Sequence, residues 1–502
     1  MTAAEKTGKE KDLAASIRQF ATASRVLEPD AAERNHLLSR VNEFAEDFLA
    51  GVDTRPAFIE TEHKGRGLYA SPITETGMDI DAVLRLFKDN VTDVGLSPVS
   101  PRFLAYIPPC SLYPGALGDF LAAVTNQFAG YFSSCPGAAR MENQLLRWMS
   151  DLIGYPATAL GAMLSGGSLA ILSSVVTARD AHGLVGRDYE KCVVYMTDLT
   201  HHAMDKALRI AGMKEAIRRR VGMDEGFRMD PQKLDDAIRA DLAAGLRPWL
   251  VAASAGTTDL GSVDPLDALA NVAERHQLWF QVDGAYGGLF ILSDLVRDKF
   301  AGIARADSVI LNAHKALFTP FGLAVVLVRD GKLLQRAHFH TANYLQDTLL
   351  EEDEISPADL GPELTRNFRG PRLWLPLKLL GVAPFRAALS EKILLTRYAY
   401  DKIKALPGFE VGPYPDLSIF AFRIVPATGD ADDFNRRLVD AIRKDGTILL
   451  SSTTLNGRYM IRFAILSYRT HLETIDLAID LIHAMVKVLQ GNPEQVSLPS
   501  CR

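Results

Sequence analysis

The middle of the chain alternates short apolar runs with segments of helical periodicity. The apolar runs cover residues 192–197, 249–256, 278–283, 308–312 and 323–328, and each has the length of a buried strand. Residues 202–216 and 231–244, and a segment opened by Asp264-Pro265 as N-cap and first helical position, carry helical patterns. Continuous β-branched runs separated by helices are typical of a mostly parallel sheet covered on both faces. The pattern therefore predicts a large α/β domain.

The two ends of the chain follow different patterns. Residues 13–95 are mainly helical in periodicity, as expected of an arm that packs on something larger. Near the C-terminus, residues 417–425, 447–450 and 458–466 are predicted strands, with a hairpin turn at Asn456-Gly457 and a capping box at 470–473 that starts a last helix. We therefore expect an N-terminal helical arm (1–112), an α/β domain (113–375) and a small α+β domain (376–502).

Composition excludes several classes of protein. The 502 residues are 48% hydrophobic and 23% charged, with a net charge of -6 and no basic patch that would indicate nucleic acid. No apolar run reaches the roughly 18 residues of a membrane span, and the first dozen residues lack the apolar core of a secretion signal. The four cysteines match neither a disulfide framework nor metal-ligand spacing. We expect no membrane, no metal and a cytoplasmic setting.

Two of the predicted strands end in ionisable side chains. Residues 278–283 end in Asp283, which is followed by Gly-Ala-Tyr-Gly-Gly, and residues 308–312 lead into Ala-His-Lys315. In an open α/β sheet, ligands bind outside the carboxyl ends of the strands, so Asp283 and Lys315 are predicted to share one crevice. A lone lysine at a strand end is usually a surface residue. The functional interpretation therefore depends on the order of the two motifs, a strand ending in Asp283 followed by a strand leading to Lys315.

Two further motifs could belong to the same crevice. The glycines and serine of residues 163–170 precede a helical pattern, which fits either a capped helix start or a phosphate cradle. His201 follows the strand at 192–197 and could stack on a ring, although the adjacent His202 leaves the choice of imidazole open. A phosphate cradle, a carboxylate for a ring nitrogen and a lysine for an aldehyde are together what a pyridoxal 5'-phosphate site needs.

These motifs resemble the group II pyridoxal-phosphate-dependent amino-acid decarboxylases, and most of all the aromatic-L-amino-acid branch. The resemblance runs in order from about residue 101 to beyond 462 and is carried by residues 103–108, 165–170, 198–201, 282–287, 312–315 and 366–374. It implies fold type I architecture, a pyridoxal 5'-phosphate cofactor, a small amino-acid substrate and a homodimer with shared active sites.

The resemblance also implies catalytic roles. Lys315 would bind the cofactor aldehyde, Asp283 would pair with the pyridine nitrogen, and His201 would stack on the ring. His314 would lie near the reacting carboxylate. Tyr344 falls where the family's mobile loop carries a tyrosine that protonates the substrate carbon.

Other positions are implied as contacts. Besides His201, Asp283, His314 and Lys315, the implied cofactor contacts are Gly167, Ser168, Thr257, Ala285 and Asn312. The implied substrate pocket comprises Phe103, Tyr106, Ile107, Pro108 and Thr365. The first four are apolar or aromatic, which disfavours glutamate and leaves smaller or polar side chains open.

Several positions depart from the family pattern and leave the substrate open. Ala313 replaces the usual proline, Ala316 a large aromatic residue, and Leu169 an acidic residue of the phosphate loop. Tyr344 together with His201 favours simple decarboxylation to the amine. An aldehyde synthase or a carbon-carbon lyase on the same cofactor is the alternative, and a non-catalytic protein with a vestigial cofactor fold is the alternative of another class.

Overall fold

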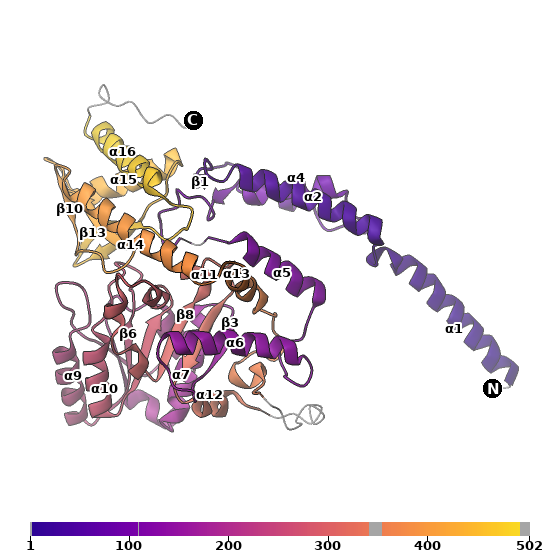
Figure 1. Ribbon diagram of the computed structural model, residues 1–502, viewed down its shortest axis with the longest axis horizontal. Coiled ribbons are helices and arrows are strands. Elements are labelled where there is room, and N and C mark those ends of the chain that lie inside the picture. The colour runs from indigo at the N-terminus through magenta and orange to yellow at the C-terminus, as the bar shows by residue number, and fades with distance from the viewer. Residues whose placement is uncertain (1–2, 109, 341–353, 492–502) are drawn as a thin grey trace. The chain divides into compact units, whose positions relative to one another are not determined.

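Figure 1 shows the computed structural model of the chain, which describes residues 3–108, 110–340 and 354–491. The chain forms two compact units, one of Met1–Arg55 with Ile59–Ser97 and one of Pro56–Phe58 with Pro98–Arg502. The predicted division into three parts stays a prediction. None of the helices in the described ranges is long and apolar enough to cross a membrane.

The first unit is mainly helical. Its α2 helix begins with a capping box, because Asp30 accepts a hydrogen bond from the Glu33 amide and Glu33 accepts one from the Asp30 amide. The elements here are α1 (Ala3–Ser24), α2 (Ala31–Ala50), β1 (Phe58–Ile59, which ends in the unit), α3 (Gly67–Ala70), α4 (Ile80–Phe87) and β2 (Gly95–Leu96).

The second unit contains a seven-stranded sheet. From edge to edge its order is β3 (Leu160–Leu164), β9 (Ala324–Val328), β8 (Ser308–Asn312), β7 (Trp279–Gly284), β6 (Arg247–Ser254), β4 (Cys192–Met196) and β5 (Ile217–Arg220). The neighbours from β8 to β5 are parallel, whereas β9 runs antiparallel to both β3 and β8. The mostly parallel sheet is therefore confirmed.

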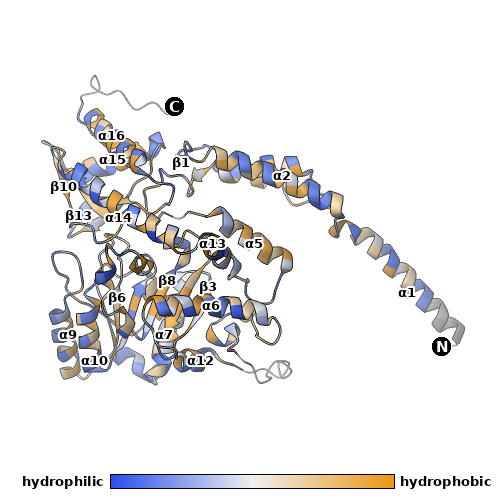
Figure 2. Ribbon diagram, in the orientation of Figure 1, coloured by the Kyte–Doolittle hydropathy of each residue, from blue (hydrophilic) through white to orange (hydrophobic). Residues whose placement is uncertain are grey.

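Helices cover both faces of this sheet. One face packs against α7 (Gly167–Ala181), α8 (Ala203–Ile210) and α12 (Gly331–His338), and the other against α6 (Pro136–Leu152), α9 (Pro231–Ala243) and α10 (Leu266–His276). Side chains alternate between the faces, so Val309 and Leu311 join one core and Ile310 joins the other. In Figure 2 the helices α9 and α10 carry blue as well as orange residues, as expected of helices with one buried side.

A smaller antiparallel sheet follows in the order β10 (Phe409–Val411), β11 (Ile419–Ile424), β13 (Arg458–Ala464) and β12 (Ser451–Leu455). It shares a core with α14 (Ala383–Lys404), α15 (Ala431–Asp445) and α16 (Leu472–Leu489). The predicted hairpin turn is confirmed, since Asn456 and Gly457 join β12 to β13 with φ of 49° and 76°. The other helices of the unit are α5 (Tyr113–Thr125), α11 (Ala313–Ala316) and α13 (Pro371–Leu380).

Four local predictions are wrong. The helix expected at 202–216 ends at Ile210, and the strand β5 follows it at Ile217. The strand expected at 447–450 lies at Ser451–Leu455 instead. Thr470 does not cap α16, because its buried hydroxyl donates to the Pro101 carbonyl, and the helix begins after His471. Asp264 does not cap α10 either, since its carboxylate accepts hydrogen bonds from the Ser254 and Met229 amides and the helix begins after Pro265.

Candidate active site

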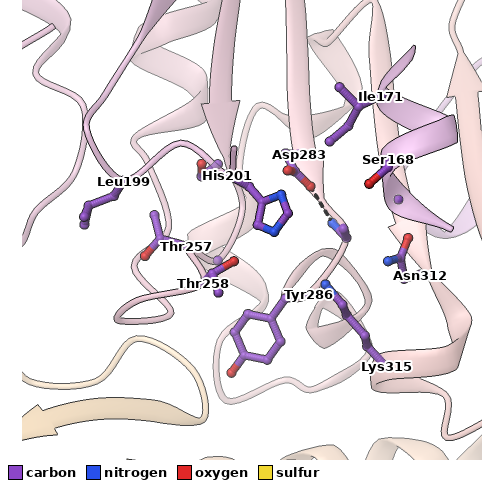
Figure 3. Close-up of a pocket in the computed structure, with 14 residues that line it drawn as sticks. Ser168, Ile171, Leu199, His201, Thr257, Thr258, Asp283, Tyr286, Asn312 and Lys315 are labelled. Carbon is purple, nitrogen blue, oxygen red and sulfur yellow. Dashed lines mark hydrogen bonds between the residues drawn. The ribbon is translucent and has the colours of Figure 1, made fainter. Parts of the chain in front are cut away.

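A pocket opens at the carboxyl edge of the large sheet, where β7 and β8 end. It collects residues from α7, from the ends of β6, β7 and β8, and from the loop after β4 (Figure 3). The predicted site residues among those that line it are Gly167, Ser168, His201, Thr257, Asp283, Ala285, Asn312 and Lys315. Segments up to about 150 residues apart thus converge on one crevice, as the parallel sheet requires.

One end of the pocket is the start of α7. Gly166 is the N-cap in an extended conformation, and no side chain of the described residues caps this helix. A Cβ on Gly167 would lie 3.1 Å from Asn312 Nδ2 and 3.7 Å from Ala285 Cβ, so only glycine leaves this corner open. Asn312 is buried, and its Oδ1 has no hydrogen-bond partner within the described residues. Bare helix amides beside an amide side chain form an anion site.

Asp283 and Lys315 lie on the pocket wall formed by β7 and by α11, the turn that follows β8. Oδ1 of Asp283 accepts a hydrogen bond of 3.0 Å from the Ala285 amide, drawn as the dashed line in Figure 3. Burial lowers the pKa of the Lys315 amine, and the Asp283 carboxylate partly offsets that shift. A buried amine with a lowered pKa is the state that a nucleophilic lysine needs.

His201 is the imidazole in the pocket. Its Nδ1 accepts a hydrogen bond of 3.2 Å from the Ala203 amide, and the ring faces Asp283 in Figure 3. The His202 ring lies 4.2 Å away, centroid to centroid, but His202 is not among the residues that line the pocket. Burial lowers the pKa of His201, with Asp283 acting in the opposite direction. The neutral ring therefore carries its proton on Nε2.

His314 is buried behind the pocket wall. Its Nδ1 donates to the Leu323 carbonyl at 2.8 Å, and its Nε2 lies 3.5 Å from Asn312 Nδ2. Burial lowers the pKa of His314 to about 4, so the ring is neutral at pH 7. In this structure it anchors the turn that carries Lys315.

The predicted substrate residues lie elsewhere in the described part of the chain. Phe103 packs in a small buried cluster, Tyr106 is 56% exposed, and neither Ile107 nor Pro108 lines the pocket. Thr365 lines a separate hollow with residues of α5 and with Arg372. Tyr344 lies outside the described residues.

Sequence reasoning missed the residues that hold the pocket wall. Arg462 of β13 is buried and donates to the carbonyls of Tyr106, Thr258 and Asp259, which ties the segment at 103–108 to the loop bearing Thr257. The Tyr286 hydroxyl bonds Ser418 at 2.6 Å and so joins the pocket to the start of β11. A single arginine inside an apolar strand gave no signal by itself.

The pocket fits pyridoxal 5'-phosphate. A phosphate would fit the open corner at Gly167, beside the uncapped start of α7. The side-chain amide of Asn312 can be turned by 180°, so that its NH2 group rather than its unpartnered oxygen faces the pocket. Asp283 supplies a carboxylate for a ring nitrogen, and Lys315 an amine for an aldehyde. The sheet and this pocket together define the class of fold type I enzymes that use pyridoxal 5'-phosphate.

Comparison with known proteins narrows the class. The family model described as the pyridoxal-dependent decarboxylase conserved domain matches residues 72–425, and the chain belongs to this family. It is thus a pyridoxal-phosphate-dependent carboxy-lyase. This family membership argues against the alternative of a non-catalytic protein.

Individual relatives agree with this family. The chain is 33% identical over 438 residues to an aromatic-L-amino-acid decarboxylase of Bacillus atrophaeus, covering 86% of this chain and 89% of the relative. It is 29% identical over 492 residues to a phenylacetaldehyde synthase of Petunia hybrida, covering 92% and 96%. The crystal structure of Oryza sativa TDC with PLP and tryptamine superposes with a TM-score of 0.86 at 27% identity, covering 92% and 99%.

Proposed function

We propose that the chain removes the α-carboxylate of an aromatic L-amino acid and releases the amine and carbon dioxide. The observation that carries the proposal is the meeting of Lys315, Asp283 and the uncapped start of α7 in one pocket. The aromatic substrate is supported by the similarity to an aromatic-L-amino-acid decarboxylase over most of both chains. Bound pyridoxal 5'-phosphate supplies an electron sink for the electron pair left when the carboxylate departs.

The chain's own residues would divide the work as follows. Lys315 would hold the cofactor through its amine until the substrate amine takes its place, and Asp283 would pair with the ring nitrogen. His201 would stack on the cofactor ring, and His314 keeps the Lys315 turn in place through Leu323. Tyr344 would deliver the proton to the substrate carbon, a step that general-acid help accelerates by roughly 100- to 10,000-fold.

The role of Lys315 is tested by absorption spectroscopy. Purified protein should show the absorption band of lysine-bound cofactor, and Lys315→Ala should remove it because no other amine lines the pocket in the described ranges. Lys206→Ala, at an exposed position of α8, is the matched control and should keep the band. An unchanged spectrum in Lys315→Ala would sink the assignment.

The reaction itself is tested with a panel of Phe, Tyr, Trp, Dopa, His and Glu. We expect an aromatic substrate to give amine and carbon dioxide in equal amounts. The second candidate, an aldehyde synthase, is favoured by the similarity to a phenylacetaldehyde synthase. Aldehyde with ammonia and peroxide as the main products would decide for that candidate, and turnover of glutamate alone would exclude the aromatic assignment.

We also propose a homodimer in a cytoplasmic setting. Several helices of the described chain expose large apolar side chains, among them Phe120 and Val124 of α5, at 50% and 66% exposure, and such faces usually become covered by a partner. Cys110, Cys135 and Cys192 are free thiols, as a reducing compartment favours.

A further inference from the structure

One face of the small sheet packs against two loops of the pocket. Apolar residues of β11, β12 and β13 form a buried cluster with Leu199 and Leu260, which lie on the loops after β4 and β6. Leu199 itself lines the pocket, and so does Thr258 on the second loop (Figure 3). Met460 belongs to the cluster, so Arg462, two residues further along β13, points to the same face. The small sheet therefore presents an arginine to the pocket loops.

Arg462 joins two segments that are distant in the sequence. Its Nη2 donates both to the Tyr106 carbonyl, at 3.0 Å, and to the Thr258 carbonyl, and its Nε donates to the Asp259 carbonyl at 3.0 Å. Its Nη1 donates to Ser451 Oγ at 2.7 Å. The arginine is only 3% exposed, and a buried guanidinium is costly without such bonds. Because one nitrogen serves both carbonyls, the Tyr106 peptide lies beside the pocket loop.

The turn at Tyr106 has a strained backbone. Its φ is 53°, in the left-handed region that a tyrosine rarely adopts. The Tyr106 amide donates to Ser451 Oγ at 3.0 Å and its carbonyl accepts from Arg462, so both of its peptide groups are held by the small sheet. The Tyr106 side chain is 56% exposed, so these bonds rather than packing hold the turn. Strain of this kind persists where the surroundings impose it, and it gathers at functional sites.

We propose that Arg462 is a positioning residue that sets the affinity for the amino-acid substrate. It holds the Tyr106 turn against the loop at 257–259, so that the rim of the pocket keeps a fixed distance from its interior. Asp283 and Lys315 stand on the large sheet, so cofactor binding should depend on Arg462 much less. This inference rests on the proposed decarboxylation, which supplies the substrate whose affinity is measured.

The closing experiment compares Arg462→Lys with the parent holoenzyme. Lysine keeps the positive charge but lacks the planar fork that reaches several acceptors at once. We expect KM for the best aromatic substrate of the panel to rise about 10-fold, while kcat changes by less than about 3-fold. The absorption band of lysine-bound cofactor should remain, because Thr257 is also held within its own loop by Ser262.

Hydrogen exchange in the apo-protein gives a readout that needs no turnover. The Tyr106 amide donates to Ser451, and the Leu104 amide donates to the Leu449 carbonyl, so both amides are protected in the parent. Arg462→Lys should speed exchange of the Tyr106 amide about 10-fold and leave the Leu104 amide as it is. Mass spectrometry with fragmentation that resolves single amides measures both rates.

Two further variants keep the test decisive. Ser451→Ala removes the acceptor shared by Tyr106 and Arg462, should raise KM in the same direction, and stands in if Arg462→Lys does not fold. Arg423→Lys is the matched control. It changes another buried arginine on the same face of the small sheet, one that pairs with Asp432 at 3.2 Å, and it should leave KM unchanged.

The outcomes separate a positioning role from a structural one. An unchanged KM in Arg462→Lys would overturn the inference, even if the melting temperature fell or the Tyr106 amide exchanged faster. Loss of the cofactor band in Arg462→Lys would overturn it as well, because the arginine would then support the cofactor. A parent protein that binds the cofactor but converts no amino acid of the panel would overturn the proposed function, and the inference with it.

Discussion

Lys315 and His314 follow one another in α11, and burial lowers the pKa of both side chains. For Lys315 this raises the fraction of neutral amine at pH 7, while the charge on Asp283 limits the shift. For His314 it removes the positive charge altogether near neutral pH, so the ring does not repel the amine. The same burial therefore makes the Lys315 amine more reactive and makes the stability of the fold depend on a neutral His314.

His314 should make the protein less stable in acid. Its folded pKa of about 4 lies below the ordinary 6.5, so the unfolded chain binds more protons between these values and stability falls as pH drops through this window. The share lost by pH 5 is about 2 kcal/mol. Urea unfolding at pH 7 and pH 5 measures it, and His314→Asn should reduce the difference.

The control for this prediction is His36→Asn, at an exposed position of α2. It should leave the pH dependence as it is in the parent chain. An equal loss of stability in the parent and in His314→Asn would show that other groups cause the acid sensitivity.

At the scale of elements, the start of α7 should bind phosphate only while its corner stays open. Gly167→Ala places a Cβ 3.1 Å from Asn312 Nδ2, and we expect cofactor affinity to fall about 10-fold, or about 1.4 kcal/mol. The stability of the apo-protein should hold, because alanine is the better helix former. Titration of the apo-protein with pyridoxal 5'-phosphate checks the first point and thermal unfolding the second.

Gly137→Ala is the matched control. It lies in the first turn of α6, where a Cβ would meet nothing within 4 Å. Loss of affinity in both variants, or in neither, would contradict a specific role for the corner at Gly167.

An element could be predicted where its pattern of apolar residues differs clearly from that of a loop. The apolar runs of β7 and β8 gave both strands and the ends that carry Asp283 and Lys315. The edge strand β5 was missed because it reads Ile-Arg-Arg-Arg, and β3 because a glycine interrupts its short run. Thr470 has the sequence of a cap but satisfies a distant carbonyl, a choice that only the tertiary fold makes.

The same limit applies to the pocket. Strand ends bring the cofactor residues together by topology, so their motifs sufficed to predict a shared crevice. Arg462 donates to three backbone carbonyl groups on two loops. Every residue has such a carbonyl, so a sequence motif does not indicate which ones an arginine will contact. The place of residues 103–108 relative to the pocket could not be read from their composition for this reason.

At the scale of the whole molecule, the exposed apolar face of α5 should be a contact between two copies. Sedimentation equilibrium should give twice the chain mass of 55.0 kDa. Replacing Phe120 and Val124 together by aspartate should shift the protein toward a single chain, because two charges would then be buried in the interface.

Leu394→Asp is the control on α14, where the side chain is also exposed, at 52%. It should leave the mass unchanged. A parent protein that sediments as a single chain would contradict the proposed dimer, and a dimer that survives both aspartates would place the contact on another face.

The antiparallel course of β9 has a kinetic consequence for the lysine. Asn312, just before the α11 turn, pairs with Ala324, and the His314 amide and ring both donate to the Leu323 carbonyl. The backbone that leads into Lys315 is therefore held by β9 and by the residue just before it. With bound cofactor, the exchange of the Lys315 amine with the substrate amine would be a swing of one side chain about an anchored Cα. The rate of that exchange should thus follow the crowding around four side-chain torsions and be insensitive to loop motion elsewhere in the chain.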